Sequence, residues 1–246
     1  MKYINKSLSI EKIKVQDIVK KFGTPIYCYS HKKLKDNISN FKKSFKSFSP
    51  LICFAIKSNT NVSLVREVRK FGLGADVVSM GELMVALKAG INPKKIVFSG
   101  VGKTSGEISY AVDKKILLIN AESKSEINEI ERIAKSKNKI VNIGIRLNPN
   151  IDAKTLKQIS TGKKENKFGV DEKTFFELVN YSNLSSNINL KCLSVHIGSQ
   201  ILDHKPYEKM LKIVDKIIKK SNYKFEFIDL GGGMGIPYEK SNKRLN

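Results

Sequence analysis

Long apolar runs and secretory signals are both missing from this chain, which excludes two classes of protein. No stretch of the sequence approaches the roughly 18 consecutive apolar residues that a membrane-spanning helix requires. The first residues, Met1–Lys6, contain neither the apolar core nor the small-residue cleavage site of a secretory signal. We therefore expect a cytoplasmic protein with no membrane partner.

Cysteine is also scarce. Cys28, Cys53 and Cys192 are odd in number, far apart and without metal-ligand spacing. Each lies in an apolar, strand-like run, where an unpaired cysteine behaves as a small hydrophobic residue. We expect all three to be buried, with no disulfide and no metal site, as is usual in a reducing compartment.

Acidic residues are few relative to basic ones: 23 Asp and Glu stand against 45 Lys and Arg, for a net charge of +22. A large positive charge is one signature of nucleic-acid-binding proteins. However, the lysines are spread through every expected helix and are not interleaved with exposed aromatic residues, as a base-stacking surface requires. We interpret the charge as a lysine-rich compositional bias and expect no nucleic-acid partner. Attraction of anionic ligands or surfaces is the alternative.

Short apolar segments rich in Ile and Val alternate with helix-like segments between residues 51 and 230. Such segments are typical of parallel strands that are covered on both faces. The expected strands are Leu51–Ile56, Ala75–Val78, Ile96–Ser99, Ile116–Ile119, Asn142–Leu147, Leu193–Ile197 and Phe225–Leu230.

Several expected helices share one start signal, a Ser or Thr followed three residues later by Glu. This capping box satisfies unpaired amides at a helix entrance, and it occurs at Ser79–Glu82, Thr104–Glu107 and Ser123–Glu126. Gly72 and Gly90 stand where helices should end. The repeated order of strand, cap and helix predicts right-handed βαβ units. Such units form either a doubly wound sheet or a (β/α)8 barrel without its last unit, and periodicity does not choose between them.

The first residues show a different pattern. Ile10–Phe22 reads as an amphipathic helix closed by Gly23, Thr24–Tyr29 reads as a strand, and Ser30 caps a further helix. The longest irregular stretch, Asn148–Phe168, is rich in Asn, Thr, Lys and Gly. A loop of that length in a compact domain is usually functional.

One lysine, Lys57, follows the apolar segment Phe54–Ile56 at the expected C-terminal end of the first strand. The ordinary interpretation is a lysine that leaves the core at a strand end. The functional interpretation is a partly desolvated amine whose lowered pKa makes it nucleophilic toward an aldehyde. In a barrel, the C-terminal ends of the strands are where the active site forms.

Four further segments place functional groups in or after expected strands. His196 and Ser199 follow one strand, and the turn Gly231–Gly233 follows the next. A glycine turn exposes successive backbone amides that suit a phosphate. Asp76 lies early in the second strand and Arg146 in the fifth. The ordinary alternatives are a core histidine that is satisfied by protein groups and a buried ion pair between Asp76 and Arg146.

Taken together, these segments resemble the fold-type III pyridoxal-phosphate enzymes, whose barrel carries the cofactor lysine at the end of its first strand. Residues 146–155, 159–162 and 167–170, together with Phe98–Thr104, resemble the diaminopimelate decarboxylases in particular. The likeness extends from about Val15 to Pro237.

The resemblance implies an α/β fold of the alanine racemase-like kind. Residues 31–246 would form an incomplete (β/α)8 pyridoxal-phosphate-binding barrel of about seven strands. Residues 1–30 would form a helix and a strand that join a C-terminal β-domain.

The resemblance also implies a role for each candidate residue. Lys57 would carry pyridoxal 5'-phosphate as a Schiff base and act in catalysis, and His196 would stack on the ring. Asp76 and Arg146 would lie near Lys57 and the ring oxygen, while the phosphate would be held by Ser199, Gly231, Gly232 and Gly233. The implied reaction is the decarboxylation of meso-diaminopimelate to L-lysine, in a homodimer with a shared active site.

The sequence departs from the family's pattern in one respect. A Glu-Pro-Gly-Arg motif and a β-domain with a proton-donating cysteine have no counterpart before Asn246. We therefore expect this chain by itself to be an incomplete enzyme with little decarboxylase activity.

Two other functions are compatible with part of this pattern. The first is a non-enzymatic pyridoxal-phosphate carrier, and the triglycine turn followed by Met234-Gly235 argues against it. The second is an ornithine or arginine decarboxylase of the same fold, and the loop at residues 148–170 favours diaminopimelate instead.

Overall fold

The computed structural model describes residues 1–152 and 168–238. It divides into two compact units, Met1–Leu51 and Ile52–Asn246. None of the helices in the described ranges is both long enough and apolar enough to span a membrane.

The first unit is a small antiparallel sheet with two helices. Its elements are β1 (Lys2–Ile4), β2 (Ser7–Ile10), β3 (Ile13–Lys14), α1 (Val15–Phe22) and α2 (His31–Ser44). The first helix begins at Val15, later than the sequence predicts, because Ile10 and Ile13 pair across the β2–β3 hairpin. Thr24–Tyr29 pairs with no strand in the described part of the chain. The resemblance assigns its sheet partners to a C-terminal β-domain, so the strand stays a prediction. Ser30 does cap α2, as its hydroxyl accepts the Lys33 amide at 3.0 Å.

The second unit alternates strands with helices. Its strands are β4 (Cys53–Ala55), β5 (Gly74–Val77), β6 (Ile96–Phe98), β7 (Leu118–Ala121), β8 (Val141–Leu147), β9 (Ile188–Val195) and β10 (Phe227–Asp229). Its helices are α3 (Val62–Lys70), α4 (Met80–Lys88), α5 (Ser105–Lys114), α6 (Lys124–Ser136), α7 (Glu172–Leu184) and α8 (Lys205–Ser221), with short 3-10 turns at Ile56–Ser58 and Pro93–Lys95. All seven strands that the sequence predicts in this unit are present, with ends shifted by a few residues.

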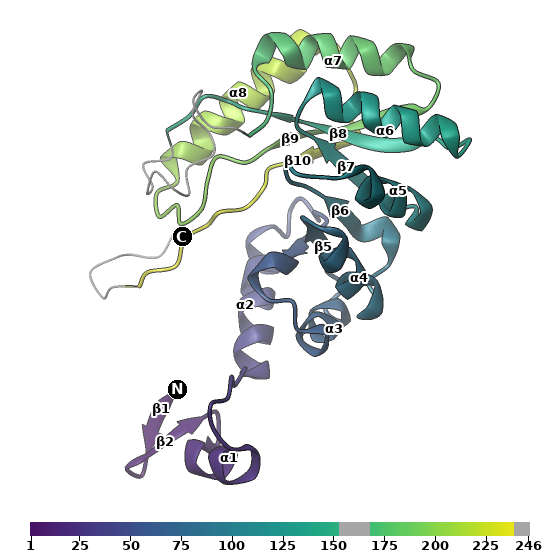
Figure 1. Ribbon diagram of the computed structural model, residues 1–246. Coiled ribbons are helices and arrows are strands. Elements are labelled where there is room, and N and C mark those ends of the chain that lie inside the picture. The colour runs from purple at the N-terminus through teal and green to yellow at the C-terminus, as the bar shows by residue number, and fades with distance from the viewer. Residues whose placement is uncertain (153–167, 239–246) are drawn as a thin grey trace. The chain divides into compact units, whose positions relative to one another are not determined.

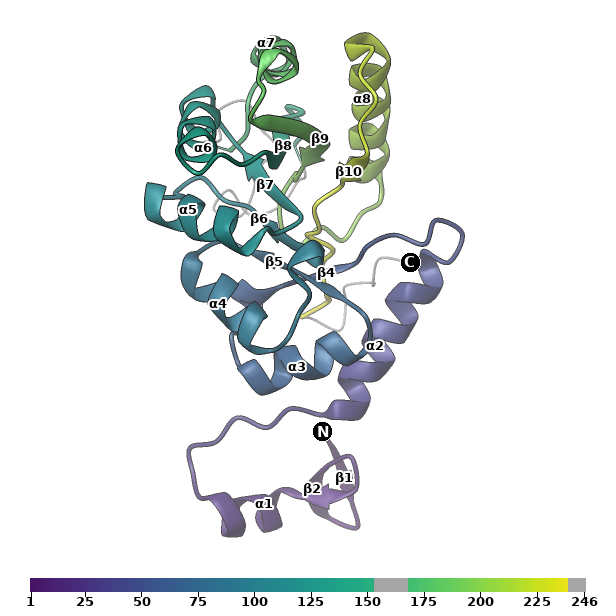
Figure 2. The same ribbon diagram turned by 90° about the vertical axis from the view of Figure 1, so that its right-hand side faces the viewer.

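These strands form one seven-stranded sheet in the sequential order β4 to β10, and each neighbouring pair is parallel. A doubly wound sheet would reverse its strand order at a switch point. The uninterrupted order is that of a (β/α)8 barrel lacking a unit, which confirms the expected fold class. The helices of this unit cover one face of the sheet (Figures 1 and 2).

Alternation along each strand separates two groups of side chains. Ile143, Ile145 and Leu147 of β8 are almost fully buried and join the large core beneath the helices. On the opposite, inner face, Val97, Leu118 and Cys192 form a second, smaller apolar cluster. Polar groups that lie on the inner face are therefore directed into the barrel.

The expected burial of the cysteines is confirmed only in part. Cys192 is fully buried and Cys53 is half-buried, and both belong to the inner face. Cys28 is exposed, so that prediction is wrong. The reason is that Cys28 lies in Thr24–Tyr29, which joins no described sheet.

The helix caps follow the sequence pattern. Thr104 and Glu107 form the complete reciprocal capping box of α5. Ser79 and Ser123 also accept the amides of Glu82 and Glu126, at 3.2 and 3.1 Å. In these two helices, however, the glutamate carboxylates reach one residue further back, to the Val78 and Glu122 amides. Capping thus accounts for the position of Glu82.

Gly74 is required where β5 passes close to the start of β6. A Cβ at Gly74 would lie 2.2 Å from the Lys95 carbonyl oxygen, which belongs to the backbone and has little freedom to move. We expect Gly74→Ala to lower the free energy of unfolding by about 1–3 kcal/mol, because overpacking forces backbone shifts. The matched control is Gly106→Ala in α5, where an added Cβ meets nothing within 4 Å. Urea denaturation of both variants is the measurement, and equal unfolding free energies would contradict the packing argument.

Candidate active site

Lys57 lies directly after β4, in the 3-10 turn Ile56–Ser58, at the C-terminal end of the strand as predicted. The Ser58 hydroxyl donates to the Ala55 carbonyl oxygen at 2.8 Å and fixes this turn. The side chain of Lys57 is exposed, whereas the sequence interpretation expects a partly desolvated amine. The exposure follows from the position of β4, which is an edge strand of the sheet.

Asp76 lies in β5 on the inner face and accepts a hydrogen bond of 2.6 Å from the Ser99 hydroxyl. Burial raises the pKa of Asp76 to about 6, and the nearby negative charge of Asp229 acts in the same direction. The Ser99 hydrogen bond and the positive charge of Lys57 lower the pKa of Asp76 but do not outweigh burial. Asp76 and Lys57 are therefore close enough to interact electrostatically.

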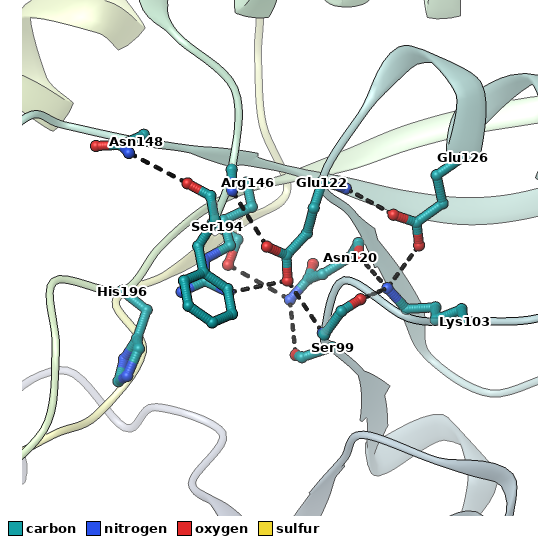
Figure 3. Close-up of polar contacts among 12 residues, drawn as sticks. Ser99, Lys103, Asn120, Glu122, Glu126, Arg146, Asn148, Ser194 and His196 are labelled. Carbon is teal, nitrogen blue, oxygen red and sulfur yellow. Dashed lines mark hydrogen bonds and ion pairs between the residues drawn. The ribbon is translucent and has the colours of Figure 1, made fainter. Parts of the chain in front are cut away.

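Arg146 pairs with Glu122, not with Asp76, so the alternative of an Asp76–Arg146 ion pair is wrong. Arg146 Nη1 donates to Glu122 Oε1 at 2.8 Å, and both side chains are at least nine-tenths buried (Figure 3). The same carboxylate accepts the Gly100 amide at 3.1 Å and the Gly169 amide at 3.2 Å. The guanidinium also lies 5.0 Å from the centre of the Phe168 ring. Glu122 thus ties together the segments that follow β6, β7 and β8.

A buried lysine reinforces this arrangement. Lys103 has no exposed side-chain surface and donates three hydrogen bonds, to the carbonyl oxygens of Gly100 and Asn120 at 2.6 and 2.7 Å and to Glu126 Oε1 at 2.6 Å (Figure 3). A buried ammonium is tolerated only when it is paired and its donors are satisfied, as here. Lys103 therefore fixes the loop after β6 against the end of β7.

His196 directly follows β9 and accepts a hydrogen bond from the Gly232 amide at Nδ1, at 3.3 Å. Burial lowers the pKa of His196 to about 4, and the positive charges of Arg146 and Lys57 contribute. The imidazole is therefore neutral near pH 7.

The glycine turn after β10 is closely packed against the segment after β9. A Cβ at Gly233 would lie 1.8 Å from the Gly198 carbonyl oxygen, and a Cβ at Gly231 would lie 2.6 Å from His196 Nδ1. Two amides of the turn are engaged by the protein: the Gly231 amide donates to Asp229 and the Gly232 amide to His196.

Two donors beside the turn remain open. Within the described ranges, neither the Ser199 hydroxyl nor the Gly233 amide makes a hydrogen bond to the protein. They are thus available to a ligand.

A hydrogen-bonded polar group on the inner face joins strands that are distant in sequence. Asn120 Nδ2 donates to Asp229 Oδ2 at 2.9 Å, and the Ser194 hydroxyl donates to the same oxygen at 3.0 Å. Asn120 Oδ1 is buried and has no hydrogen-bond partner among the residues that the structure describes. Sequence reasoning singled out neither Asn120 nor Glu122, although each lies in or directly after β7, at the strand end where a barrel site forms.

A parallel sheet in sequential strand order, with a lysine, a neutral histidine and a glycine turn at its C-terminal strand ends, is typical of α/β-barrel enzymes, whose sites form at that end of the strands. Residues 31–246 match the family model for the pyridoxal-dependent decarboxylase, pyridoxal binding domain. The chain therefore belongs to the pyridoxal-dependent decarboxylase family.

The curated relatives carry a more specific name. The chain is 45% identical over 227 residues to a diaminopimelate decarboxylase of Helicobacter pylori strain J99, covering 91% of the chain and 56% of the relative. It is 39% identical over 247 residues to that of Aquifex aeolicus, covering 99% and 58%. The chain thus spans slightly more than half of the length of these relatives.

Solved structures give the same picture. The structure of the Helicobacter pylori diaminopimelate decarboxylase complexed with L-lysine matches with a TM-score of 0.87 and 42% identity, covering 94% of this chain and 59% of that one. The structure of the diaminopimelate decarboxylase from M. jannaschii in co-complex with L-lysine matches with a TM-score of 0.90 and 34% identity, covering 97% of this chain and 58% of that one.

The residues present fit the cofactor that this family requires. The close approach of Gly233 to the Gly198 carbonyl leaves no room for a side chain at position 233. A neutral imidazole offers a flat face for a ring, and Ser199 and Gly233 offer donors for a phosphate.

The neutral state of His196 gives a testable pH dependence. Because the pKa of His196 is lowered from its ordinary value of 6.5 to about 4, the unfolded chain binds more protons than the folded one between these values. The contribution of His196 to stability is thus present above about pH 6.5 and is lost as the pH falls toward 4.

We expect the ring protons of His196 to show a neutral imidazole in NMR spectra at pH 5.5, where an ordinary histidine is about 90% protonated. His196→Asn assigns the signal by removing it. Lys57→Met should raise the midpoint, since it removes an exposed positive charge that lowers this pKa. A wild-type midpoint near the ordinary histidine value of 6.5 would contradict the lowering of the His196 pKa by burial.

Proposed function

We propose that this chain binds pyridoxal 5'-phosphate at Lys57 and that the protein decarboxylates meso-diaminopimelate to L-lysine. The observation that supports it best is the meeting of three groups at one edge of the sheet. Lys57 lies at the end of β4, His196 follows β9, and Gly231–Gly233 follow β10. Lys57 and His196 interact electrostatically although they belong to strands far apart in the sheet.

Each residue has a distinct task in this proposal. Lys57 supplies the amine that bonds to the cofactor aldehyde, and its exposure leaves it accessible. His196 stays neutral, so its ring packs on the cofactor ring without adding a charge. Ser199 and Gly233 donate hydrogen bonds to the phosphate. Once bound, pyridoxal phosphate supplies the electron sink that makes loss of carbon dioxide from an amino acid possible.

Asp76 and Arg146 contribute charge from two sides. Asp76 has a pKa of about 6, so small changes in its surroundings alter its charge beside Lys57 near neutral pH. Arg146 is held by Glu122 at 2.8 Å, and its positive charge helps to keep His196 neutral. In this proposal, Asp76 sets the charge beside Lys57 and Arg146 sets the charge state of His196.

Diaminopimelate is the proposed substrate because relatives that are 37–45% identical to this chain bear the name diaminopimelate decarboxylase. The likeness to a chlorella virus arginine decarboxylase is only 22% identical and shows the fold alone. A homodimer with a shared active site, a cytoplasmic location and the absence of a nucleic-acid partner stay predictions.

Peptide mapping tests the cofactor lysine. We expect borohydride reduction of the chain loaded with pyridoxal phosphate to leave the pyridoxyl group on Lys57, because this lysine lies at the C-terminal strand ends and interacts electrostatically with His196. Lys57→Arg should abolish the adduct, whereas Lys94→Arg, at the opposite end of the strands, should leave it intact. An adduct that is mainly on another lysine would refute the cofactor site.

Substrate preference is tested separately, in the full-length protein that contains this chain. Carbon dioxide release from meso-diaminopimelate should exceed release from ornithine and arginine by at least about tenfold, a difference of about 1.4 kcal/mol in transition-state binding. Equal rates, or a preference for arginine, would refute the substrate while leaving the cofactor site in place.

A further inference from the structure

We propose that Asp229 is a positioning residue that holds the glycine turn in the shape that binds the cofactor phosphate. This inference rests on the proposed function and deepens it, since it assigns a task to a residue that does not itself touch the cofactor. Asp229 is the last residue of β10, directly before the turn Leu230–Gly233. β10 is an edge strand of the described sheet, so backbone pairing holds it on one side only.

The carboxylate of Asp229 connects the turn to the barrel interior. Its Oδ1 accepts the Gly231 amide at 2.9 Å, which fixes the first peptide of the turn. Its Oδ2 accepts Asn120 Nδ2 at 2.9 Å and the Ser194 hydroxyl at 3.0 Å. Ser194 belongs to β9, which pairs with β10, and Asn120 belongs to β7, two strands further along the sheet. Asp229 therefore connects the turn to both of these strands.

The anchoring is specific because the turn has little freedom to relax. Gly231 has a φ of +66° and Gly233 a φ of +85°, in the left-handed region that other residues rarely adopt. The Gly232 amide donates to His196 Nδ1, so the first two amides are held from two sides. The Gly233 amide is then the one donor of the three that is left for a ligand in this part of the described chain.

Charge cannot explain a carboxylate at this position. A negative group beside a phosphate site opposes anion binding, as like charges repel. If Asp229 contributes to phosphate affinity, it must therefore do so through geometry. Replacement of Asp229 by asparagine keeps an oxygen for the Gly231 amide and removes the charge. The side-chain amide of the new asparagine then needs an acceptor. Asn120 Oδ1, which is buried and has no partner among the described residues, can accept it after the Asn120 side chain flips.

The experiment compares the affinity of the chain for pyridoxal phosphate with its affinity for pyridoxal, which lacks the phosphate. The ratio of the two reports on the phosphate site and cancels effects on Lys57 or on the ring. We expect Asp229→Ala to lower this ratio by about tenfold to a hundredfold, because it releases the Gly231 amide and two inner hydrogen bonds. Asp229→Asn should keep the ratio within about threefold of wild type or raise it, since it retains the shape without the repulsion.

Two further variants make the comparison independent of folding. Asn120→Ala removes one anchor of Asp229 without touching the turn, and it should lower the ratio less than Asp229→Ala does. Glu226→Gln is the charge control, because it removes an equal charge three residues earlier in the chain. Glu226 is exposed and pairs with Lys191, away from the turn, so this variant should leave the ratio unchanged. Thermal unfolding without ligand shows which variants are folded.

Each outcome is decisive. An unchanged ratio in folded Asp229→Ala, or in Asn120→Ala if Asp229→Ala does not fold, would overturn the positioning role. Equal losses in Asp229→Asn and Asp229→Ala would also overturn it, because they would show that charge and not geometry is needed. A wild-type chain that binds pyridoxal phosphate no better than pyridoxal would instead refute the proposed phosphate site itself.

Discussion

The parallel register of the seven strands is the constraint on which the candidate site depends. Because each strand pairs in parallel with the next one along the chain, all C-terminal ends meet at one edge of the sheet. Alternation along the strands then directs Asp76, Asn120 and Ser194 to the inner face, while Ile143 and Ile145 pack under the helices. A shift of one residue in any strand would exchange these two sets. Sheet geometry thus determines which side chains can reach a ligand.

Polar contacts inside the barrel then fix the strand ends. The Glu122 carboxylate joins the segments after β6, β7 and β8, and Lys103 ties the loop after β6 to β7 and α6. Asp229 likewise fixes the end of β10, because its carboxylate accepts the Gly231 amide. Buried charges of this kind contribute little net stability, but leaving one of them unpaired is costly. Their value lies in holding short loops in one geometry beside the site.

The sequence was sufficient to predict the seven strands of the large sheet, the capped helix starts and the strand-end position of Lys57, because these depend on local patterns of apolar residues and caps. It placed the start of α1 five residues too early, because it missed the β2–β3 hairpin. It did not predict the three short strands β1, β2 and β3, since two to four residues are too few to show an alternating pattern. It also missed the contact between Asn120 and Asp229, which are 109 residues apart. Such contacts arise from strand register, which no single segment reveals. The expected loop at residues 148–168 falls largely outside the described ranges and stays a prediction.

A crystal structure of the protein grown with pyridoxal 5'-phosphate tests the central claim most directly. The account predicts continuous electron density between Lys57 Nζ and the cofactor, with the ring against His196 and the phosphate within hydrogen-bonding distance of the Ser199 hydroxyl and the Gly233 amide. Density for the cofactor on a different lysine, or a phosphate bound away from the turn Gly231–Gly233, would contradict it.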